Sequence, residues 1–280
     1  MTPVIVNADD YGLVESVDAA IIALGRLGVV TACSAMVEPS RWPVAAAAFR
    51  GAFGTGGNGT PEIGLHLELG RSGVGLPRTL VRAYARQLER GALQGLVDRQ
   101  LDRFEDEIGA APVFVDGHEH VHQLPRVRDV LVDRLLARYR GDAMPAIRIC
   151  APSRWRGMKA ALIGVLGASA LRSLAGAAGL PTNSDFAGVY DFSPSADLPA
   201  LWRRWVSTSA GPRPVIMCHV ALPGEVAAAG DRIAGARERE FAWLSSPGFG
   251  QLLESLDARP VGWRGQGLPT RCASPVRQAP

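Results

Sequence analysis

The sequence predicts an α/β fold with a mostly parallel sheet of about seven or eight strands. Short apolar runs rich in β-branched residues alternate along the chain with amphipathic stretches of helical spacing. Chemically versatile side chains, including all five histidines, fall at the carboxyl ends of these runs. In parallel α/β sheets ligands bind at that edge, and a closed or nearly closed barrel would bring such side chains together at one end.

Each expected strand is a short buried run. The run Pro-Val-Phe-Val at residues 112–115 is typical, because its side chains are apolar or β-branched and turn residues follow it. In residues 146–150 an arginine, Arg148, interrupts such a run. The expected strands are residues 3–7, 29–37, 62–69, 112–115, 146–150, 182–188, 214–219 and 260–263.

The stretches between the strands show helical spacing. In residues 14–27, for example, Val17, Ile21 and Leu24 fall on or near one face. The stretch 160–180 is the most apolar, but glycines, serines and Arg172 make it too poor for a membrane span. It is either a buried helix pair or a surface that touches lipid or a partner. The expected helices are residues 14–27, 43–50, 80–108 (as two helices), 127–140, 160–180, 198–207 and 231–244.

Length and composition fit a single domain. The chain has 280 residues, 47% of them hydrophobic, which is ample for one large core over residues 1–264. Residues 265–280 are rich in Gly, Pro, Gln and Arg, and we expect a disordered tail. The four cysteines are widely spaced, which argues against a disulfide framework and a cysteine-built zinc site. Together with the absence of a basic leader this predicts a cytoplasmic protein.

Charge excludes some functions. The net charge is +3, and Lys159 is the single lysine, so nearly all positive charge is arginine. The arginines are scattered near acids, so we expect no nucleic-acid partner, and one lysine makes Schiff-base chemistry improbable. The arginine- and tryptophan-bearing helices either form a homodimer face or are simply solvated.

The sequence Asp-Gly-His-Glu-His-Val-His at residues 116–122 carries three of the five histidines. Imidazole is the commonest biological metal ligand, and a neighbouring carboxylate joins the metal or orients the ring. In an extended segment His118, His120 and His122 would share one face. The simpler alternative is that one or two of them satisfy backbone groups. We predict a metal site here.

Other reactive side chains also follow expected strands. The adjacent carboxylates of Asp9 and Asp10 repel each other unless a cation or a proton lies between them, although such pairs also occur in ordinary turns. His66 and His219 end two further runs. Arg148 needs a carboxylate partner if it is buried, either to orient Asp9 or as a structural salt bridge.

Together these groups suit hydrolysis of an amide or ester. Two or three histidines and one aspartate leave open positions on a metal, which is the pattern of a catalytic site. Such a metal acidifies bound water and polarises a carbonyl oxygen. A carboxylate outside the metal's ligands can take the water's proton, and a histidine across the site can protonate the leaving group.

Four motifs resemble the YdjC-type carbohydrate deacetylases, which include chitooligosaccharide deacetylases and hopanoid-biosynthesis-associated members. They are residues 7–12 (NADDYG), 64–67 (GLHL), 116–122 (DGHEHVH) and 217–219 (MCH). Residues 182–192 and the acids and arginine of 231–240 resemble later segments of the family. The resemblance covers residues 3–263 in the same order with similar spacing.

The resemblance implies an irregular (β/α) barrel similar to polysaccharide deacetylases, with a divalent metal, usually Mg²⁺ and in some cases Zn²⁺. By analogy Asp10, His66 and His118 hold the metal, Asp9 is the general base and His219 the general acid. The remaining candidates are expected to support the ligands or contact substrate: Asp116, His120, His122, Arg148 and Asp185.

The function expected is removal of an acetyl group from an N-acetylated sugar or oligosaccharide. One alternative is a deacylase of a glycolipid or a hopanoid-linked sugar. Another is a non-catalytic sugar- or metal-binding barrel, which the intact Asp9-Asp10 pair disfavours because binding alone needs no spare base.

Overall fold

The structure is a computed structural model of the chain and describes residues 1–265 except 58, 71–75, 155 and 229. The tail expected to be disordered lies, apart from Gly265, outside the described residues. The sheet contains eight strands in the order β5-β4-β3-β2-β1-β7-β6, with β8 paired to the start of β1, and every pairing between these strands is parallel. The strands are β1 (Thr2–Tyr11), β2 (Ala32–Ala35), β3 (Glu62–Leu67), β4 (Phe114–Gly117), β5 (Ala146–Ile147), β6 (Asp185–Ala187), β7 (Pro214–Cys218) and β8 (Ala258–Pro260).

The sheet curls until its edge strands β5 and β6 approach each other. Ile147 forms an isolated parallel bridge with Thr182, just before β6. The side chain of Asn183 accepts a hydrogen bond from the Ile149 N–H at 2.6 Å and donates one to the Ile149 carbonyl at 3.0 Å. The predicted irregular (β/α) barrel is therefore confirmed, and a bridge rather than a ladder joins its two edges.

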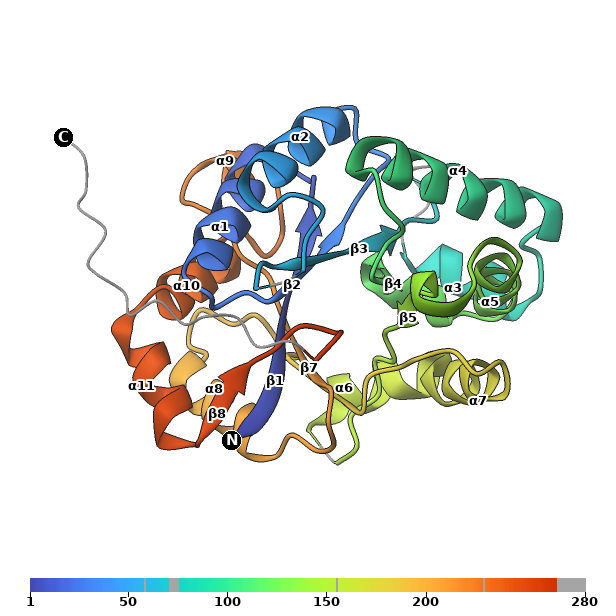
Figure 1. Ribbon diagram of the computed structural model, residues 1–280. Helices are drawn as coiled ribbons and strands as arrows, with labels where there is room; N and C mark the ends of the chain where they lie inside the picture. The colour runs from blue at the N-terminus through green and yellow to red at the C-terminus, as the bar shows by residue number, and fades with distance from the viewer. Residues whose placement is uncertain (58, 71–75, 155, 229, 266–280) are drawn as a thin grey trace.

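Helices surround the outside of the curled sheet, with α1 and α2 on one flank and α4 and α5 on another (Figure 1). The helix α8 has the bounds that the sequence predicts, whereas the short α9 and the helix α11 were not expected. The helices are α1 (Glu15–Arg26), α2 (Trp42–Phe53), α3 (Leu76–Tyr84), α4 (Arg90–Ile108), η1 (His118–Gln123), α5 (Val127–Arg138), η2 (Gly141–Ala143), α6 (Met158–Ile163), η3 (Gly164–Ala168), α7 (Ser169–Ala177), α8 (Leu198–Ser207), α9 (Glu225–Ala228), α10 (Ala234–Leu244) and α11 (Pro247–Ser255).

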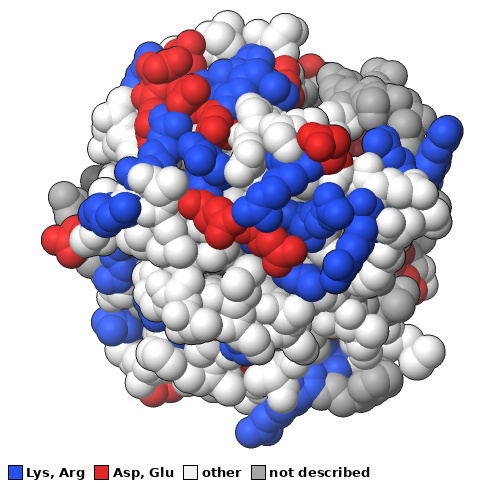
Figure 2. Space-filling model, turned by 90° about the vertical axis from the view of Figure 1, so that its right-hand side faces the viewer, with Lys and Arg blue, Asp and Glu red and all other residues white. Residues whose placement is uncertain are grey.

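The surface and the helices bear on two expectations about partners. Among the described helices, none is both long and apolar enough to cross a membrane. On the face over α4 and α5, acidic and basic side chains are interspersed (Figure 2).

Trp202 and Trp205 of α8 are buried, and Trp202 packs edge-on against Phe249 of α11. These tryptophans therefore fill the core. The ion pairs that link α4 to α5 are Arg90–Asp133, Arg134–Asp98, Arg138–Asp102 and Arg138–Glu105.

Alternation along the strands divides the core into two layers. On β1, Val4, Val6 and Ala8 pack outward against the helices, whereas Ile5 joins a smaller cluster inside the barrel. Phe114 belongs to the same inner cluster and stacks on Trp263, with ring centroids 4.7 Å apart. The barrel is thus packed with apolar side chains, and the inward positions that follow them along each strand form the next layer.

Gly64 of β3 makes room for this packing. A Cβ atom at Gly64 would lie 2.5 Å from the Phe114 carbonyl oxygen and 2.7 Å from the Phe114 ring. The backbone and ring of Phe114 therefore approach this glycine closely. Only a residue without a Cβ allows β3 to lie directly against the phenylalanine.

We predict that Gly64→Ala lowers the unfolding free energy by about 1–3 kcal/mol, because the methyl group overpacks the barrel. Gly51 of α2 is the matched control: a Cβ there meets nothing within 4 Å. Gly51→Ala should raise stability by up to about 1 kcal/mol through helix propensity. Urea unfolding of both variants decides this, and equal effects would contradict the packing explanation.

Candidate active site

The inward positions above the apolar core are occupied by polar residues from six neighbouring strands. On β1, Asn7 and Asp9 follow Ile5 at two-residue steps, and on β4 Asp116 follows Phe114 in the same way. The parallel register sets His66 of β3 directly beside Asp116. The polar layer at the carboxyl ends of the strands consists of Asn7, Asp9, Ser34, His66, Asp116, Arg148 and His219.

Asp9 and Asp10 both reach the site because β1 is irregular at this point. In a regular strand two consecutive side chains would point to opposite faces. Here the register with β2 shifts between Ala8 and Tyr11, and Asp10 has a left-handed φ of 70°. The bulge turns Asp10 toward His66 and His118, while Asp9 keeps the inward direction of Ile5 and Asn7.

Asp10, His66 and His118 form the cluster that could hold a metal ion, and each offers a donor atom within 4.8 Å of the others. Asp10 Oδ1 lies 3.0 Å from His118 Nδ1 and 3.4 Å from His66 Nε2. The other ring nitrogen of His66, Nδ1, is 2.5 Å from Asp116 Oδ1. A carboxylate behind an imidazole is typical of metal ligands, because it fixes the ring and leaves the opposite nitrogen free for the ion.

The triad lies in a field that favours positive charge. Burial lowers the pKa of His66, but the carboxylates of Asp116, Asp10 and Asp9 raise it more, to about 10. The pKa of Asp10 is held well below its usual range: burial opposes this, and Arg237 and His118 outweigh burial. A divalent cation and protons therefore compete for the same three donors, so the residues present fit a metal.

Asp9 is held by a buried guanidinium. Arg148 donates from both terminal nitrogens to the two carboxylate oxygens of Asp9, at 2.6 and 2.8 Å, and also lies 3.0 Å from Asp116. Asn7 Nδ2 donates to Asp9 at 2.8 Å. Burial acts to raise the pKa of Asp9. The charge and hydrogen bonds of Arg148 outweigh burial and lower this pKa, so that Asp9 is ionised at neutral pH. The pairing of Arg148 with Asp9 is present as anticipated.

The three clustered histidines do not share one face, because residues 118–122 are not extended. They form the 3-10 turn η1, in which Glu119 and His120 have left-handed φ values of 52° and 61°. His118 therefore points to Asp10, while the His120 ring meets Phe186 edge-on at 5.9 Å. His122 Nε2–H donates to the Arg148 carbonyl at 2.8 Å. The simpler alternative, a histidine that satisfies a backbone group, describes His122.

His219 follows β7, on the other side of β1 from β2. Its backbone N–H donates to Glu240 at 3.1 Å, and its ring meets Phe192 edge-on with a centroid distance of 5.4 Å. Burial lowers the pKa of His219 to about 4, so the ring is neutral at neutral pH. Its Nδ1 atom is buried without a hydrogen-bond partner among the described residues.

Three site residues, Asn7, Ser34 and Arg237, were given no role by sequence reasoning. Arg237 of α10 donates to Asp10 Oδ2 at 2.6 Å, and Ser34 of β2 donates to Asp116 Oδ2 at 2.6 Å and accepts from Asn7. The signal for Ser34 was a hydroxyl within an apolar strand. The signal for Arg237 was its place among the charges of residues 231–240, which resemble a family segment.

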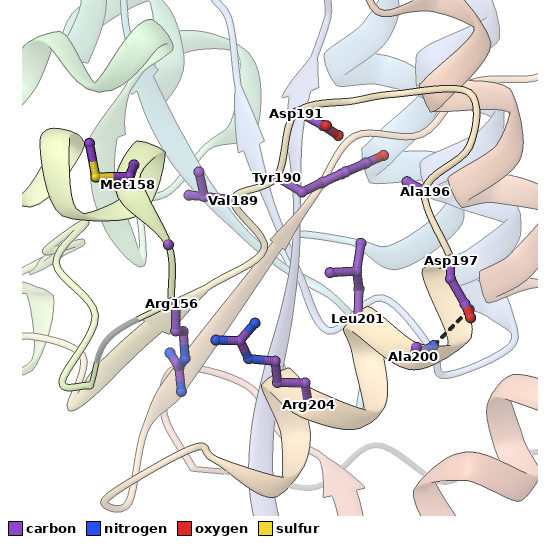
Figure 3. A pocket seen from close by; sticks show the side chains of 11 residues that line it. Arg156, Met158, Val189, Tyr190, Asp191, Ala196, Asp197, Ala200, Leu201 and Arg204 are labelled. Atoms are coloured by element: carbon purple, nitrogen blue, oxygen red, sulfur yellow. Dashed lines mark hydrogen bonds between the residues drawn. The ribbon is translucent and has the colours of Figure 1, made fainter.

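Asp185 is not brought to this cluster. It is the first residue of β6, at the opposite end of the strand from the site, and it pairs with Arg156 at 2.7 Å. Arg156 lines a separate cavity of about 530 Å³ beside α8, and its other lining residues include Met158, Val189, Asp191, Leu201 and Arg204 (Figure 3). None of the triad residues lines this larger cavity. A smaller one of about 290 Å³ adjoins His118.

Comparison with known proteins fits this geometry. A family profile described as YdjC-like protein matches residues 3–255. The chain belongs to the YdjC-like protein family.

Two curated relatives have sugar-related names. A chitooligosaccharide deacetylase of Enterobacter sp. (strain 638) is 33% identical over 138 residues, covering 44% of this chain and 51% of the relative. A carbohydrate deacetylase of Geobacillus stearothermophilus is 35% identical over 163 residues, covering 54% and 62%. The chain thus spans about half the length of the curated relatives it matches.

A solved structure supports the fold. It is the crystal structure of an Enterococcus faecalis V583 protein with a suggested role in cellobiose-phosphate cleavage. The two chains superpose with a TM-score of 0.70 over 95% of this chain and 99% of that one, at 21% identity. The irregular barrel of this YdjC-like chain is therefore shared by a protein of low sequence identity.

We predict that Arg148→Met lowers the unfolding free energy by about 3–5 kcal/mol, because two buried carboxylates lose their partner. The control is Arg90→Met, since Arg90 and Asp133 are both more than half exposed. That change should cost less than about 1 kcal/mol. Chemical denaturation of both variants tests the prediction, and a cost for Arg148→Met as small as the control would contradict it.

A second prediction concerns His122, whose pKa burial lowers to about 3. Between that pH and about 6.5 the unfolded chain binds a proton here that the folded protein excludes. This group therefore contributes a loss of stability of about 1.4 kcal/mol per pH unit as pH falls through that window. His122→Gln, measured by urea unfolding in chelator between pH 4 and 7, should show a shallower decline than the parent protein. Parallel curves would disprove the assignment.

Proposed function

We propose that this chain is a metal-dependent hydrolase that removes an acetyl group from an N-acetylated sugar. The observation that carries the proposal is an ionised carboxylate, Asp9, that lies beside a metal-type triad without belonging to it. A binding protein needs the triad alone. The names of the curated relatives support a carbohydrate substrate and an acetyl group.

Asp10, His66 and His118 would hold a divalent metal. Two imidazoles and one carboxylate form a donor set that suits zinc, while the carboxylate and the open positions also suit magnesium, the ion implied by the family resemblance. Such a metal, when bound, lowers the pKa of water toward about 7 and polarises the acetyl carbonyl. Asp116 orients His66, and Arg237 orients Asp10.

The protein's own groups would manage the protons. Arg148 and Asn7 hold Asp9 in one orientation, and Asp9 takes a proton from the attacking water as the new C–O bond forms. When the C–N bond breaks, the amine nitrogen needs a proton, which His219 passes on from the opposite flank of β1. A neutral ring can do this by accepting a proton at one nitrogen while releasing one from the other. The proton that Asp9 took from the water replaces the one that His219 gives up, so both side chains return to their initial states. The products are acetate and the amine, which takes up the remaining proton of the water as an ammonium group.

Acetate release from N-acetylglucosamine oligomers tests the proposal. We expect chelated protein to be inactive, and activity to return with Mg²⁺ or Zn²⁺, which identifies the metal. Asp9→Asn should lower kcat by roughly 10²–10⁴-fold, because it removes proton transfer. Its metal content should match that of the parent protein, since Asp9 lies outside the triad.

The control is Asp98→Asn, which alters a half-buried acid on α4 far from the site and should keep full activity. Metal binding without acetate release in the parent protein would reject the substrate while leaving the site intact. Failure to bind either metal would reject the mechanism.

A further inference from the structure

Charge is unevenly distributed along the chain. Residues 69–88 and 143–184, which we call the two acid-free segments, contain nine of the 30 basic residues and none of the 27 acidic ones. The rest of the chain is therefore net negative. Exposed cations of the two segments include Arg78 and Arg82 of α3, Arg86 just after it, and Arg154 before α6. Within the part of the chain that the structure describes, none of these four guanidinium groups forms an ion pair.

The same two segments carry most of the large apolar side chains that stay exposed. Six such side chains occur among the described residues, and four of them lie in the acid-free segments, which make up less than a quarter of the chain. These four are Val81 (66% exposed), Tyr84 (49%), Met158 (79%) and Val165 (79%). Arg78, Val81 and Arg82 are three and four residues apart, so α3 presents cations and an apolar side chain on one exposed face.

The two acid-free segments lie on either side of η1, the turn that carries His118. On one side, Thr79 of α3 and His118 line the same cavity. On the other side, η3 lies directly against η1, because a Cβ atom at Gly167 would be 2.1 Å from the Gln123 carbonyl oxygen. Below the charges over α4 and α5, where Figure 1 places α6 and α7, the face shown in Figure 2 is largely uncharged. Glu119 of η1 is the acid between the two segments.

Exposed arginines beside exposed aliphatic side chains suit a membrane surface. Arginines are attracted to anionic lipid headgroups, and apolar side chains gain free energy by entering the interface below them. A nucleic acid also attracts arginine, but its phosphate backbone offers no apolar layer to Met158 and Val165. A second copy of this chain is disfavoured too, because a symmetric dimer would bring the basic segments of both copies together, and like charges repel.

We propose that the two acid-free segments dock the protein on a bilayer that contains anionic lipids. Arg78 and Arg82 contact the headgroups, and Met158 and Val165 enter the interface. Docking turns η1, and with it the side of the barrel that carries His118, toward the membrane. The inference concerns a surface and holds independently of the proposed reaction.

Flotation of the full chain with lipid vesicles tests the proposal. The vesicles consist of phosphatidylcholine with or without phosphatidylglycerol. We expect binding only where phosphatidylglycerol is present, and we expect salt to weaken it because counterions screen the headgroups. Arg78→Gln combined with Arg82→Gln should lower the partition coefficient roughly thirtyfold, as expected for two arginines near an anionic surface. Met158→Ser combined with Val165→Ser should lower it roughly tenfold, because less apolar surface is buried.

The matched controls lie outside both segments. Arg26→Gln combined with Arg259→Gln changes the net charge equally at two exposed positions, and Arg259 lies on β8, which pairs with the amino end of β1. Val44→Ser removes an apolar side chain that is 69% exposed. The controls should keep the partition coefficient of the parent protein. All variants should keep its urea midpoint, because every substituted side chain is exposed.

The inference is overturned if the parent protein binds neither kind of vesicle, or binds both equally. Equal losses in the test and control variants also overturn it. Tighter binding to duplex DNA than to anionic vesicles would assign the arginines to a nucleic acid instead. A dimer in sedimentation experiments that Met158→Ser with Val165→Ser dissociates would assign the surface to a second copy of the chain, and so would reject the membrane.

Discussion

The pairing of Arg148 with Asp9 and Asp116 is the interaction on which the site depends. Three carboxylates of the site, those of Asp9, Asp10 and Asp116, are almost completely buried. Burying charge is unfavourable unless each charge is paired and hydrogen-bonded. Arg148 neutralises the pair on one side of β1 and Arg237 neutralises Asp10 on the other. Because Asp9 and Asp10 each have their own guanidinium, the adjacent acids of β1 are held close without direct repulsion between unpaired charges.

This division gives neighbouring aspartates different tasks. Asp9 is fixed by a two-point contact with Arg148. Asp10 uses one oxygen for Arg237 and the other for the two histidines. Asp9 and Asp10 are consecutive residues of the same type, and the left-handed backbone conformation of Asp10 alone gives them different surroundings. The chemistry proposed here needs that difference.

Much of this arrangement could be predicted from the sequence, because strand periodicity and the position of each reactive residue after an apolar run are local signals. The helical spacing of residues 198–207 gave correct bounds for the same reason. Residues 118–122 are not the extended segment in which the three histidines would share one face, because Glu119 and His120 have left-handed φ values that periodicity does not predict. Ser34 and Arg237 act through partners far away in sequence, and Asp185 shows the reverse: a polar residue in a plausible motif that Arg156 engages elsewhere.

The alternation along β1 has a consequence for how the chain can vary. Ile5, Asn7 and Asp9 reach the interior because they are separated by single residues. Deleting one residue between Ile5 and Asp9 would turn the Asp9 carboxylate out among the helices and bring Ala8 or Val6 inward. Substitution at an outward position changes only the packing against the helices, whereas a one-residue change of length moves the side chains beyond it to the opposite face of the sheet. Related sequences can therefore differ in length between strands. Within β1, however, any insertion or deletion must change the length by an even number of residues, so that Asp9 still faces inward.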